Sequence, residues 1–297
     1  MAKLISTILM LFLLACSPVS PKTQGIRNFT FASMGDAQGA VVPFTKTVKQ
    51  VVAMNPNLIL FTGDLEDTGA TLSQMAGMTS VFKNAGVYAK TYAIRGNHDD
   101  EHANDAIIWD KYFQRDYFFY YGNSAFIGLD VPGTITKKWT DSQLKILDAD
   151  LSLAKAHGSA FVFVFFHGPL YCADLMHCTC VTRTSSLCTP TSLITELNKY
   201  PIVSAIFVGH NHLLAWTHVD NTRLLKLKTS FEEFFTSPAG GSSHNALAIS
   251  SRLDYLYKGI GSGQGFAMVT VSDSSYSVRY YKTGTVVPVW NKTFSSK

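Results

Sequence analysis

The sequence predicts a layered α/β fold built as one large domain, and two observations support this prediction. The chain has 297 residues, of which 46% are hydrophobic and 15% are charged, so it is long enough to bury a sizeable core. From residue 26 onward, short apolar runs alternate with amphipathic stretches of helical period. This alternation is typical of strands that pack in layers against helices.

The apolar runs and amphipathic stretches define the expected elements in order. The expected strands are residues 26–34, 57–62, 87–94, 124–129, 160–166 and 202–208. The expected helices are residues 42–54, 72–84, 102–113, 141–156 and 191–199. After residue 212 the pattern changes to strands and Gly/Ser turns, with runs at 266–271 and 276–281. The aromatic run 117–121 is expected to be a packed strand rather than a stacking platform, because aromatic residues favour strands.

The first 15 residues have the features of a signal peptide. They contain one basic residue, Lys3, and an apolar run from Leu4 to Leu14, which is too short to span a bilayer. Cys16 follows the small residue Ala15, as in a bacterial lipoprotein signal, so we expect cleavage before Cys16 and lipidation of its thiol. The alternative is a plain secretory signal with an incidental cysteine.

Residues 16–25 are polar and rich in proline, and we expect them to tether residues 26–297 to a membrane through Cys16. An exported lipoprotein of this kind would be periplasmic or on the cell surface. The formal net charge is +4, so only a mild basic excess is present. We therefore expect no nucleic-acid partner, because nucleic-acid surfaces show clustered Lys and Arg.

The remaining four cysteines all lie in one short stretch, at Cys172, Cys178, Cys180 and Cys188. An even number of cysteines in an exported protein predicts two disulfides that staple a loop. Their pairing stays open, although Cys178 and Cys180 are too close for an easy bond. A structural zinc site is the alternative, but the stretch lacks paired C-x-x-C knuckles.

Most of the expected strands before residue 212 end in a short motif of Asp, Asn or His. The motifs are G-D-A-Q-G at 35–39, G-D-L-E-D at 63–67, G-N-H-D at 96–99, H-G-P at 167–169 and G-H-N-H at 209–212. The carboxyl ends of strands in an open α/β sheet collect at one edge, so we expect these groups to converge on one crevice.

Carboxylate, amide and imidazole groups without thiolate suit hard or borderline divalent metals. Two such ions close together need a bridging carboxylate to offset their repulsion. Glycines precede Asp36, Asp64, Asn97 and His210, and we expect them to let the backbone turn tightly so that each ligand reaches inward.

This ordered set of motifs resembles the calcineurin-like metallophosphoesterases. The resemblance covers residues 29–212, and the later Ser-Pro-Ala-Gly-Gly at 237–241 is similar to a Gly-rich turn of that family. It implies a layered β-sandwich flanked by helices, with a dinuclear metal site at the carboxyl ends of the strands. The implied cofactors are two divalent ions, drawn from Mn, Zn, Fe or Mg.

The resemblance also implies a role for each motif residue. The implied ligands of the first metal are Asp36, Asp64 and His212, and those of the second are Asp64, Asn97, His167 and His210. Asp64 would bridge the two metals. Gln38 stands where the family usually has His, and its amide oxygen is a weaker candidate ligand.

The implied reaction is hydrolysis of a small phosphomonoester or phosphodiester by a water or hydroxide held by the metals. His98 would be the general acid that protonates the leaving oxygen, with Asp99 as its orienting partner. A non-catalytic metal-binding or interaction module on the same fold is the alternative. A nuclease is disfavoured by the low basic content.

Two local features concern the family branch and the substrate. Residues 167–172 resemble the H-x-P-x-Y-C stretch of some purple acid phosphatases, but Asp67 stands where that branch has its metal-binding Tyr. We expect the cysteine-rich loop 171–190 to form a wall of the substrate pocket. Glu66 and Asp67 are expected to be loop caps or outer groups.

The other histidines fall into two groups. His102, His157 and His218 are expected to be hydrogen-bonded core residues rather than ligands. His177 and His244 are candidates for substrate contact.

Overall fold

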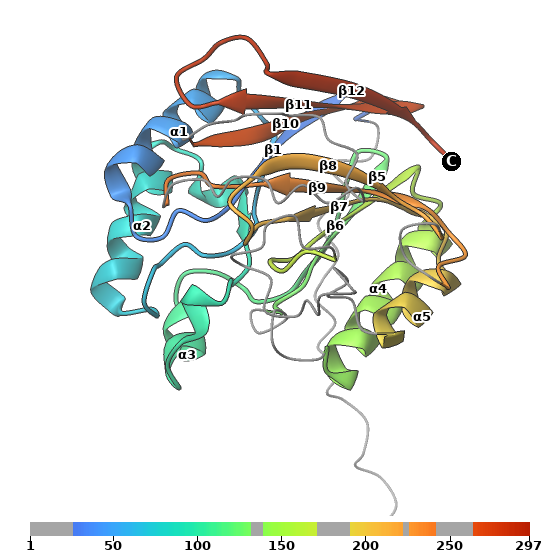
Figure 1. The fold of residues 1–297 in the computed structure, drawn as a ribbon, viewed down its shortest axis with the longest axis horizontal. Coiled ribbons are helices and arrows are strands. Elements are labelled where there is room, and N and C mark those ends of the chain that lie inside the picture. Colours follow the sequence, from blue (N-terminus) through green and yellow to red (C-terminus); the bar gives the residue numbers. More distant parts are fainter. Residues whose placement is uncertain (1–25, 132–138, 171–190, 222–225, 242–263) are drawn as a thin grey trace, which may run out of the picture.

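A computed structural model describes residues 26–131, 139–170, 191–221, 226–241 and 264–297. Two six-stranded sheets face each other, and helices cover part of their outer faces (Figure 1). This arrangement confirms the predicted α/β sandwich flanked by helices. Within the described ranges, no helix is both long and apolar enough to cross a membrane.

The first sheet contains the strands that lead into the three N-terminal motifs. Its order is β12 (Trp290–Ser295), β11 (Ser275–Lys282), β10 (Gly265–Val271), β1 (Phe29–Met34), β2 (Leu58–Phe61) and β3 (Thr91–Ala93). The strands β1, β2 and β3 are parallel, whereas β10, β11 and β12 pair antiparallel. The carboxyl ends of β1, β2 and β3 therefore lie at the same end of this sheet.

The second sheet contains the strands that lead into the His167 and His210 motifs. Its order is β4 (Tyr117–Tyr121), β5 (Ser124–Gly128), β6 (Phe161–Phe165), β7 (Val203–Val208), β9 (Phe231–Thr236) and β8 (Leu214–Val219). The strands β5, β6, β7 and β9 are parallel, and β4 and β8 form antiparallel edges.

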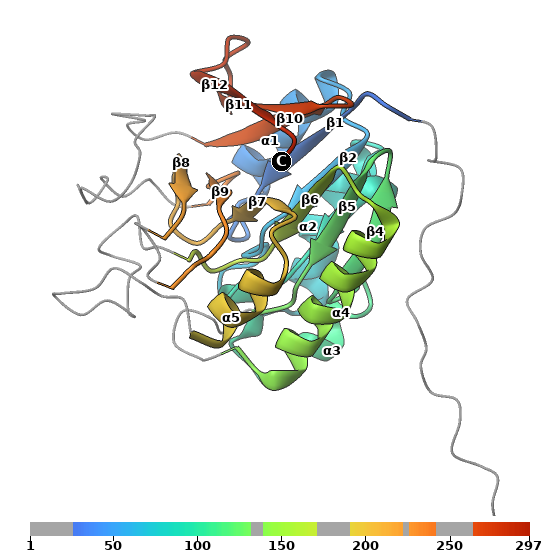
Figure 2. The same ribbon diagram turned by 90° about the vertical axis from the view of Figure 1, so that its right-hand side faces the viewer.

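Helices form the two outer layers. The helices α1 (Val41–Ala53) and α2 (Leu72–Asn84) bury their apolar faces against the first sheet, in a cluster that includes Phe44, Phe61 and Phe82. The helices α4 (Asp141–His157) and α5 (Thr191–Lys199) cover the second sheet, as Figure 2 shows. The helix α4 begins with a capping box, in which Thr140 and Gln143 exchange side-chain to backbone hydrogen bonds.

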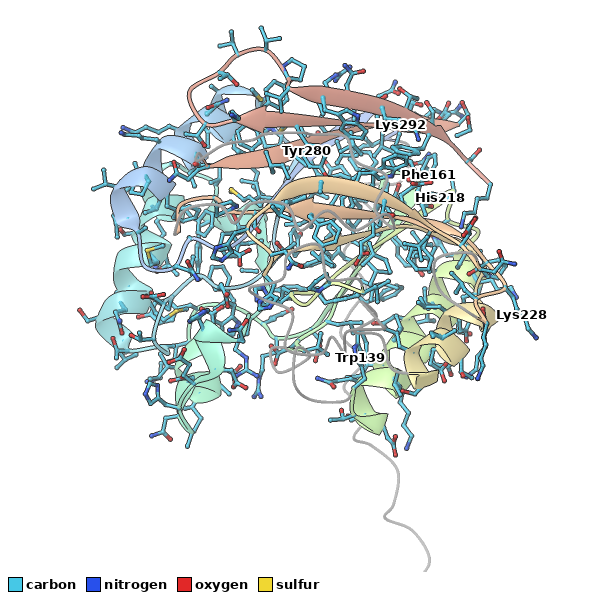
Figure 3. All side chains as sticks on the ribbon, in the orientation of Figure 1. Trp139, Phe161, His218, Lys228, Tyr280 and Lys292 are labelled. Carbon is cyan, nitrogen blue, oxygen red and sulfur yellow. The ribbon has the colours of Figure 1, made fainter. Side chains whose placement is uncertain are left out.

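Aromatic rings fill the space between the sheets. Phe31 of β1 lies within ring-contact distance of Phe126, Phe163 and Phe207 of the second sheet, with centroids 5.1 to 5.5 Å apart. The Tyr280 hydroxyl of β11 donates to the carbonyl of Ala215 in β8, and both sheets contribute to the dense packing in Figure 3. This core fixes the relative position of the two sheets, and hence of the motifs at their ends.

Most expected elements are confirmed, and the differences have physical causes. The range 87–94 was predicted as one strand, but its first half is the 3₁₀ helix η2 (Tyr88–Lys90), and β3 is only three residues long. The predicted helix 102–113 is shorter, as α3 (Asp105–Trp109), and is preceded by the 3₁₀ helix η3 (His98–Asp100). The loop that carries Asn97 and His98 takes the place of the first turn of the second element, whereas η2 lies at the amino end of β3, before the strand that leads to the site.

Several predictions fall outside the described residues. They are the signal peptide 1–15, the tether 16–25, lipidation of Cys16, the two disulfides of Cys172, Cys178, Cys180 and Cys188, the pocket wall 171–190, and substrate contacts of His177 and His244.

Candidate metal centre

The motifs converge from both sheets. Asp36, Asp64 and Asn97 follow β1, β2 and β3 of the first sheet, whereas His167 and His210 follow β6 and β7 of the second. The sequence reasoning placed all of them at the edge of one sheet. That part was wrong, because the strands divide between two facing sheets whose carboxyl ends meet.

Two groups of buried side chains offer metal-binding atoms. In one, Asp36, Asp64 and His212 place one ligand atom each within 4.8 Å of the others. In the other, Asp64, His167 and His210 do the same. Asp64 belongs to both groups, which is the arrangement that a carboxylate bridging two cations requires.

Four of these residues have left-handed backbone conformations. The φ angles are 56° for Asp36, 55° for Asp64, 64° for His210 and 50° for His212. Residues other than glycine rarely adopt this region, although Asp, Asn and His do so most often, and each instance costs on the order of 1 kcal/mol. Such strain clusters at functional sites, where surrounding contacts maintain it.

The glycines that precede the ligands are needed mainly because a larger residue would collide with neighbouring ligand side chains, and less because the backbone turns there. A Cβ atom at Gly96 would overlap the carboxylate and the backbone nitrogen of Asp64. A Cβ atom at Gly209 would lie 2.5 Å from Asp36 Oδ2. Among the four glycines, only Gly63 has a positive φ angle, so the predicted tight turns occur mainly at the ligand residues themselves.

Backbone groups hold the two aspartates in place. The His210 amide donates to both carboxylate oxygens of Asp36, at 2.9 and 3.0 Å. The His98 amide donates to Asp64 Oδ1 at 2.9 Å, while Asp64 Oδ2 is buried, accepts no hydrogen bond from the described residues and lies 3.3 Å from His167 Nε2. A buried, unpartnered carboxylate oxygen is costly unless a cation or donor faces it.

His167 is oriented so that one ring nitrogen faces the cluster. Its Nδ1 donates to the carbonyl of Thr62 at 2.8 Å, since a carbonyl only accepts. Its Nε2 lies 3.0 Å from Asn97 Oδ1 and 3.3 Å from Asp64 Oδ2. A carbonyl that fixes the distal nitrogen is typical of histidines that bind metals. The structure thus places Asn97 next to His167 of the second group.

The protonation of these groups reflects their mutual contacts. Burial alone would raise the pKa of Asp64, but the nearby His167 lowers it to about 2. Burial opposes the charged form of His167, yet the Asp64 carboxylate raises its pKa to about 9. His212 likewise has a raised pKa, because Asp36 outweighs burial. The protons on His167 and His212 therefore offset the negative charges of Asp64 and Asp36, and cations that bind would displace these protons.

Taken together, these residues fit a dinuclear centre. The shared Asp64 is surrounded by oxygen and nitrogen ligand atoms, and its second oxygen has no hydrogen bond within the described part of the chain. The surrounding residues are Asp36, Asn97, His167, His210 and His212. This donor set suits Mn, Zn, Fe or Mg and excludes none of them. The side-chain oxygen of Gln38 lies beside Gly241, 2.6 Å from where a Cβ atom at that position would be, and its role as a ligand stays a prediction.

The candidate acid His98 lies beside the cluster and is part-exposed. Its Nδ1 lies 2.6 Å from the Asp67 carbonyl and 3.1 Å from Glu101 Oε1. Burial lowers the pKa of His98, but the charge of Asp64 and the Asp67 carbonyl raise it above its usual value. A raised pKa keeps the imidazole protonated nearer to neutral pH, as a general acid requires.

Asp99 does not orient His98, contrary to the sequence-based expectation. Its carboxylate accepts three backbone hydrogen bonds, from Leu65 at 3.1 Å, Glu66 at 2.8 Å and Gly96 at 2.9 Å. These bonds tie the Asp64 loop to the Asn97 loop, and the His98 ring is bonded instead to the Asp67 carbonyl and Glu101. Because Asp99 directly follows His98, their side chains diverge.

The remaining polar predictions have mixed outcomes. His102 is exposed beside Asp105, His157 is exposed and stacks on Tyr120, and His218 bonds Glu232. None of the three belongs to either metal-binding group. The predicted core position was wrong for His102 and His157, which are exposed, whereas His218 is half-buried. Glu66 is buried, as an outer group of the site, and burial raises its pKa to about 8.

One buried charged residue at the site was missed by sequence reasoning. Arg95 ends the β3 run directly before Gly96 and is 5% exposed. The signal was an arginine within an otherwise apolar run, immediately before a ligand motif.

This combination of a two-sheet sandwich and a shared buried aspartate defines a metallophosphoesterase fold with a candidate dinuclear site. The chain belongs to the calcineurin-like phosphoesterase family, whose model matches residues 29–214. The resemblance noted from the motifs is thereby confirmed.

Solved structures agree with this fold. GAP50, the anchor in the inner membrane complex of Plasmodium, is similar over 91% of this chain and 90% of its own, with 16% identity and a TM-score of 0.64. A dimetal phosphatase from Danio rerio is similar over 91% and 99%, with 14% identity and a TM-score of 0.59. PhoD is similar over 91% and 70%, with 13% identity and a TM-score of 0.63. No curated protein sequence matches the chain.

Proposed function

We propose that this protein is a metal-dependent hydrolase of small phosphomonoesters or phosphodiesters. The observation that carries the proposal is the position of Asp64. It is shared by two buried metal-binding groups, and one of its oxygens has no hydrogen bond from any residue that the structure describes. The backbone amide of the candidate acid His98 bonds its other oxygen, so acid and cluster are held together.

In this proposal the two groups around Asp64 hold one divalent ion each. Asp36 and His212 complete the first group, and Asn97, His167 and His210 complete the second. When bound, such ions polarise phosphoryl oxygens and lower the pKa of water. The carbonyl of Thr62 and the amide of His210 keep His167 and Asp36 oriented.

The chain itself supplies the proton for the leaving oxygen. His98 carries that proton on Nε2, because its Nδ1 proton is directed at the Asp67 carbonyl and Glu101. These two groups fix the ring plane, and Asp99 fixes the loops on either side of it. A positioned general acid typically contributes 10²–10⁴-fold to the rate.

The test uses the full chain purified in mild detergent. Phosphate or alcohol release is measured on monoesters, diesters and cyclic nucleotides with Mn, Zn, Fe and Mg, together with bound metal. His98→Ala should retain metal and lose about 10²–10⁴-fold in turnover, since only the acid is removed. Asp64→Ala should lose both metal and turnover. Metal binding without hydrolysis of any ester in the panel would overturn the proposal.

The second candidate is a non-catalytic module on the same fold. The similarity to GAP50, described as an anchor, shows that the fold alone does not decide between them. The part-exposed His98 beside the cluster favours catalysis, because a scaffold has no need of an acid there. The same ester panel separates the two candidates.

We further propose that the protein acts outside the cytoplasm, anchored to a membrane through Cys16. The apolar run 4–14 and the Ala-Cys junction at 15–16 support this proposal. Wild-type protein should fractionate with membranes and incorporate labelled palmitate. Cys16→Ser should do neither, and equal membrane association of the two proteins would contradict lipid anchoring.

A further inference from the structure

Arg95 occupies an unusual place for a charged residue. It is 5% exposed and lies between the end of β3 and the motif Gly96-Asn97-His98. A buried charge is costly unless charged partners and hydrogen bonds surround it. Arg95 therefore needs carboxylate partners that offset its buried charge.

One partner anchors Arg95 to the second sheet. Its Nε lies 3.0 Å from Asp130 Oδ1 and its Nη2 lies 2.6 Å from Asp130 Oδ2, which is a bidentate pair. Asp130 follows β5 and is itself fixed, because its amide donates to Asp116 at 2.9 Å and its carbonyl accepts from Gln143 of α4 at 2.7 Å.

The other partner lies on the turn that carries the candidate acid. Arg95 Nη1 donates to Asp100 Oδ1 at 2.5 Å, and Asp100 is the last residue of η3, whose first residue is His98. A planar guanidinium reaches both carboxylates at once with fixed geometry. One side chain thus links the His98 turn to the end of the second sheet.

We infer that Arg95 is a positioning residue for His98. Through Asp100 it holds η3 against Asp130, and so it fixes where the His98 ring lies relative to the metal-binding groups. This inference rests on the proposed function, in which His98 protonates the leaving oxygen. Arg95 itself touches neither ligand group in the described contacts.

The leaving group distinguishes positioning from general support of the fold. An alkyl oxygen needs protonation as it leaves, whereas p-nitrophenolate leaves well without it. A displaced His98 should therefore slow hydrolysis of alkyl esters and largely spare p-nitrophenyl esters. Loss of fold or metal would slow both kinds of ester equally.

The experiment compares Arg95→Lys with wild type on a p-nitrophenyl ester and a matched alkyl ester, at saturating metal. Lysine keeps the charge but cannot form the bidentate pair and reach Asp100 together. We expect kcat on the alkyl ester to fall at least tenfold more than on the p-nitrophenyl ester. Bound metal should stay at the wild-type level.

Two further variants make the result interpretable. Asp100→Asn keeps the Arg95–Asp130 pair and weakens only the link to η3, so it should show the same selective loss of alkyl-ester hydrolysis. It therefore provides the test if Arg95→Lys folds poorly. Arg115→Lys is the matched control, because Arg115 and Asp110 form a similar bidentate pair, at 2.8 and 2.7 Å, on the exposed surface. It should leave both esters unaffected.

A double-mutant comparison completes the test. In a His98→Ala background, Arg95→Lys should cause no further selective loss, because the positioned group is absent. The positioning role would be overturned if kcat fell equally on both esters. It would also be overturned if neither Arg95→Lys nor Asp100→Asn lowered kcat on either ester. A wild-type protein that cleaves neither ester would instead refute the proposed function, and this inference with it.

Discussion

The conformation and position of Asp64 are restricted in several ways at once. It has a left-handed backbone, accepts the His98 amide, and lies so close to Gly96 that no side chain fits at position 96. Glycine at 96 is therefore a packing requirement of the site. Neither strain nor close approach is visible in the motif itself, since a Gly-Asp pair is usually only a turn.

The first prediction follows from that close approach. Gly96→Ala should reduce metal affinity at least tenfold and destabilise the protein by about 1–3 kcal/mol, because a Cβ at 96 overlaps the backbone nitrogen of Asp64 as well as its carboxylate. Metal titration and urea unfolding measure the two effects.

Gly77→Ala is the matched control for this substitution. Gly77 lies inside α2 with no atom within 4 Å of an added Cβ, so alanine there should stabilise the protein by about 0.5–1 kcal/mol. Wild-type metal affinity in Gly96→Ala would show that the site tolerates displacement of Asp64.

The identities of the site residues could be predicted, but their contacts could not. The strand-end motifs indicated which residues converge, and the structure brings Asp36, Asp64, Asn97, His167, His210 and His212 together. The partner of His98 was predicted wrongly as Asp99, because sequence adjacency does not show where neighbouring side chains point. The Arg95–Asp130 pair joins residues 35 positions apart, and its geometry requires the fold.

The sequence pattern predicted the bounds of those helices and strands whose residues have strong intrinsic preferences. The strand β4 (Tyr117–Tyr121) and the helix α2 (Leu72–Asn84) have the predicted bounds, since their residues carry strong strand or helix preferences. The strands β8, β9 and β12 were not predicted from the sequence. The strand β9 contains Glu232 and Glu233, and adjacent carboxylates do not resemble a buried strand.

Glu233 of β9 gives a prediction for that element. It is fully buried, its Oε1 accepts from the Leu170 amide at 2.7 Å, and its Oε2 has no hydrogen-bond partner among the described residues. Burial raises its pKa from 4.5 to about 8. The folded state therefore keeps a proton that the unfolded chain releases between these two values, so the free energy of unfolding falls as pH rises through this window.

Glu233→Gln should remove that dependence, because glutamine stays neutral and still accepts from Leu170. Relative to wild type, the variant should gain stability progressively from about pH 4.5 to pH 8, by at most about 5 kcal/mol. Urea unfolding of both proteins at pH 5, 7 and 9 measures the difference. Parallel stability curves for the two proteins would show that Glu233 ionises normally.

The candidate metal centre lies where the two sheets meet. Asp36, Asp64 and Asn97 come from the first sheet, and His167 and His210 come from the second. The aromatic core between the sheets, which includes Phe31, Phe126 and Phe207, packs the two sheets against each other. Bound cations would add a second link between the sheets.

The last prediction follows from that geometry. Cations that bind only the folded chain at 100 times their dissociation constant should stabilise it by about 2.7 kcal/mol per site, and hence raise Tm by about 5–10 °C for a domain of this size. Calorimetry of the protein before and after chelation measures this shift. Asp64→Ala should melt at one temperature with or without chelator, because it lacks the ligand common to both groups. If chelation removes the metal from the wild-type protein and leaves Tm unchanged, the ions do not link the sheets.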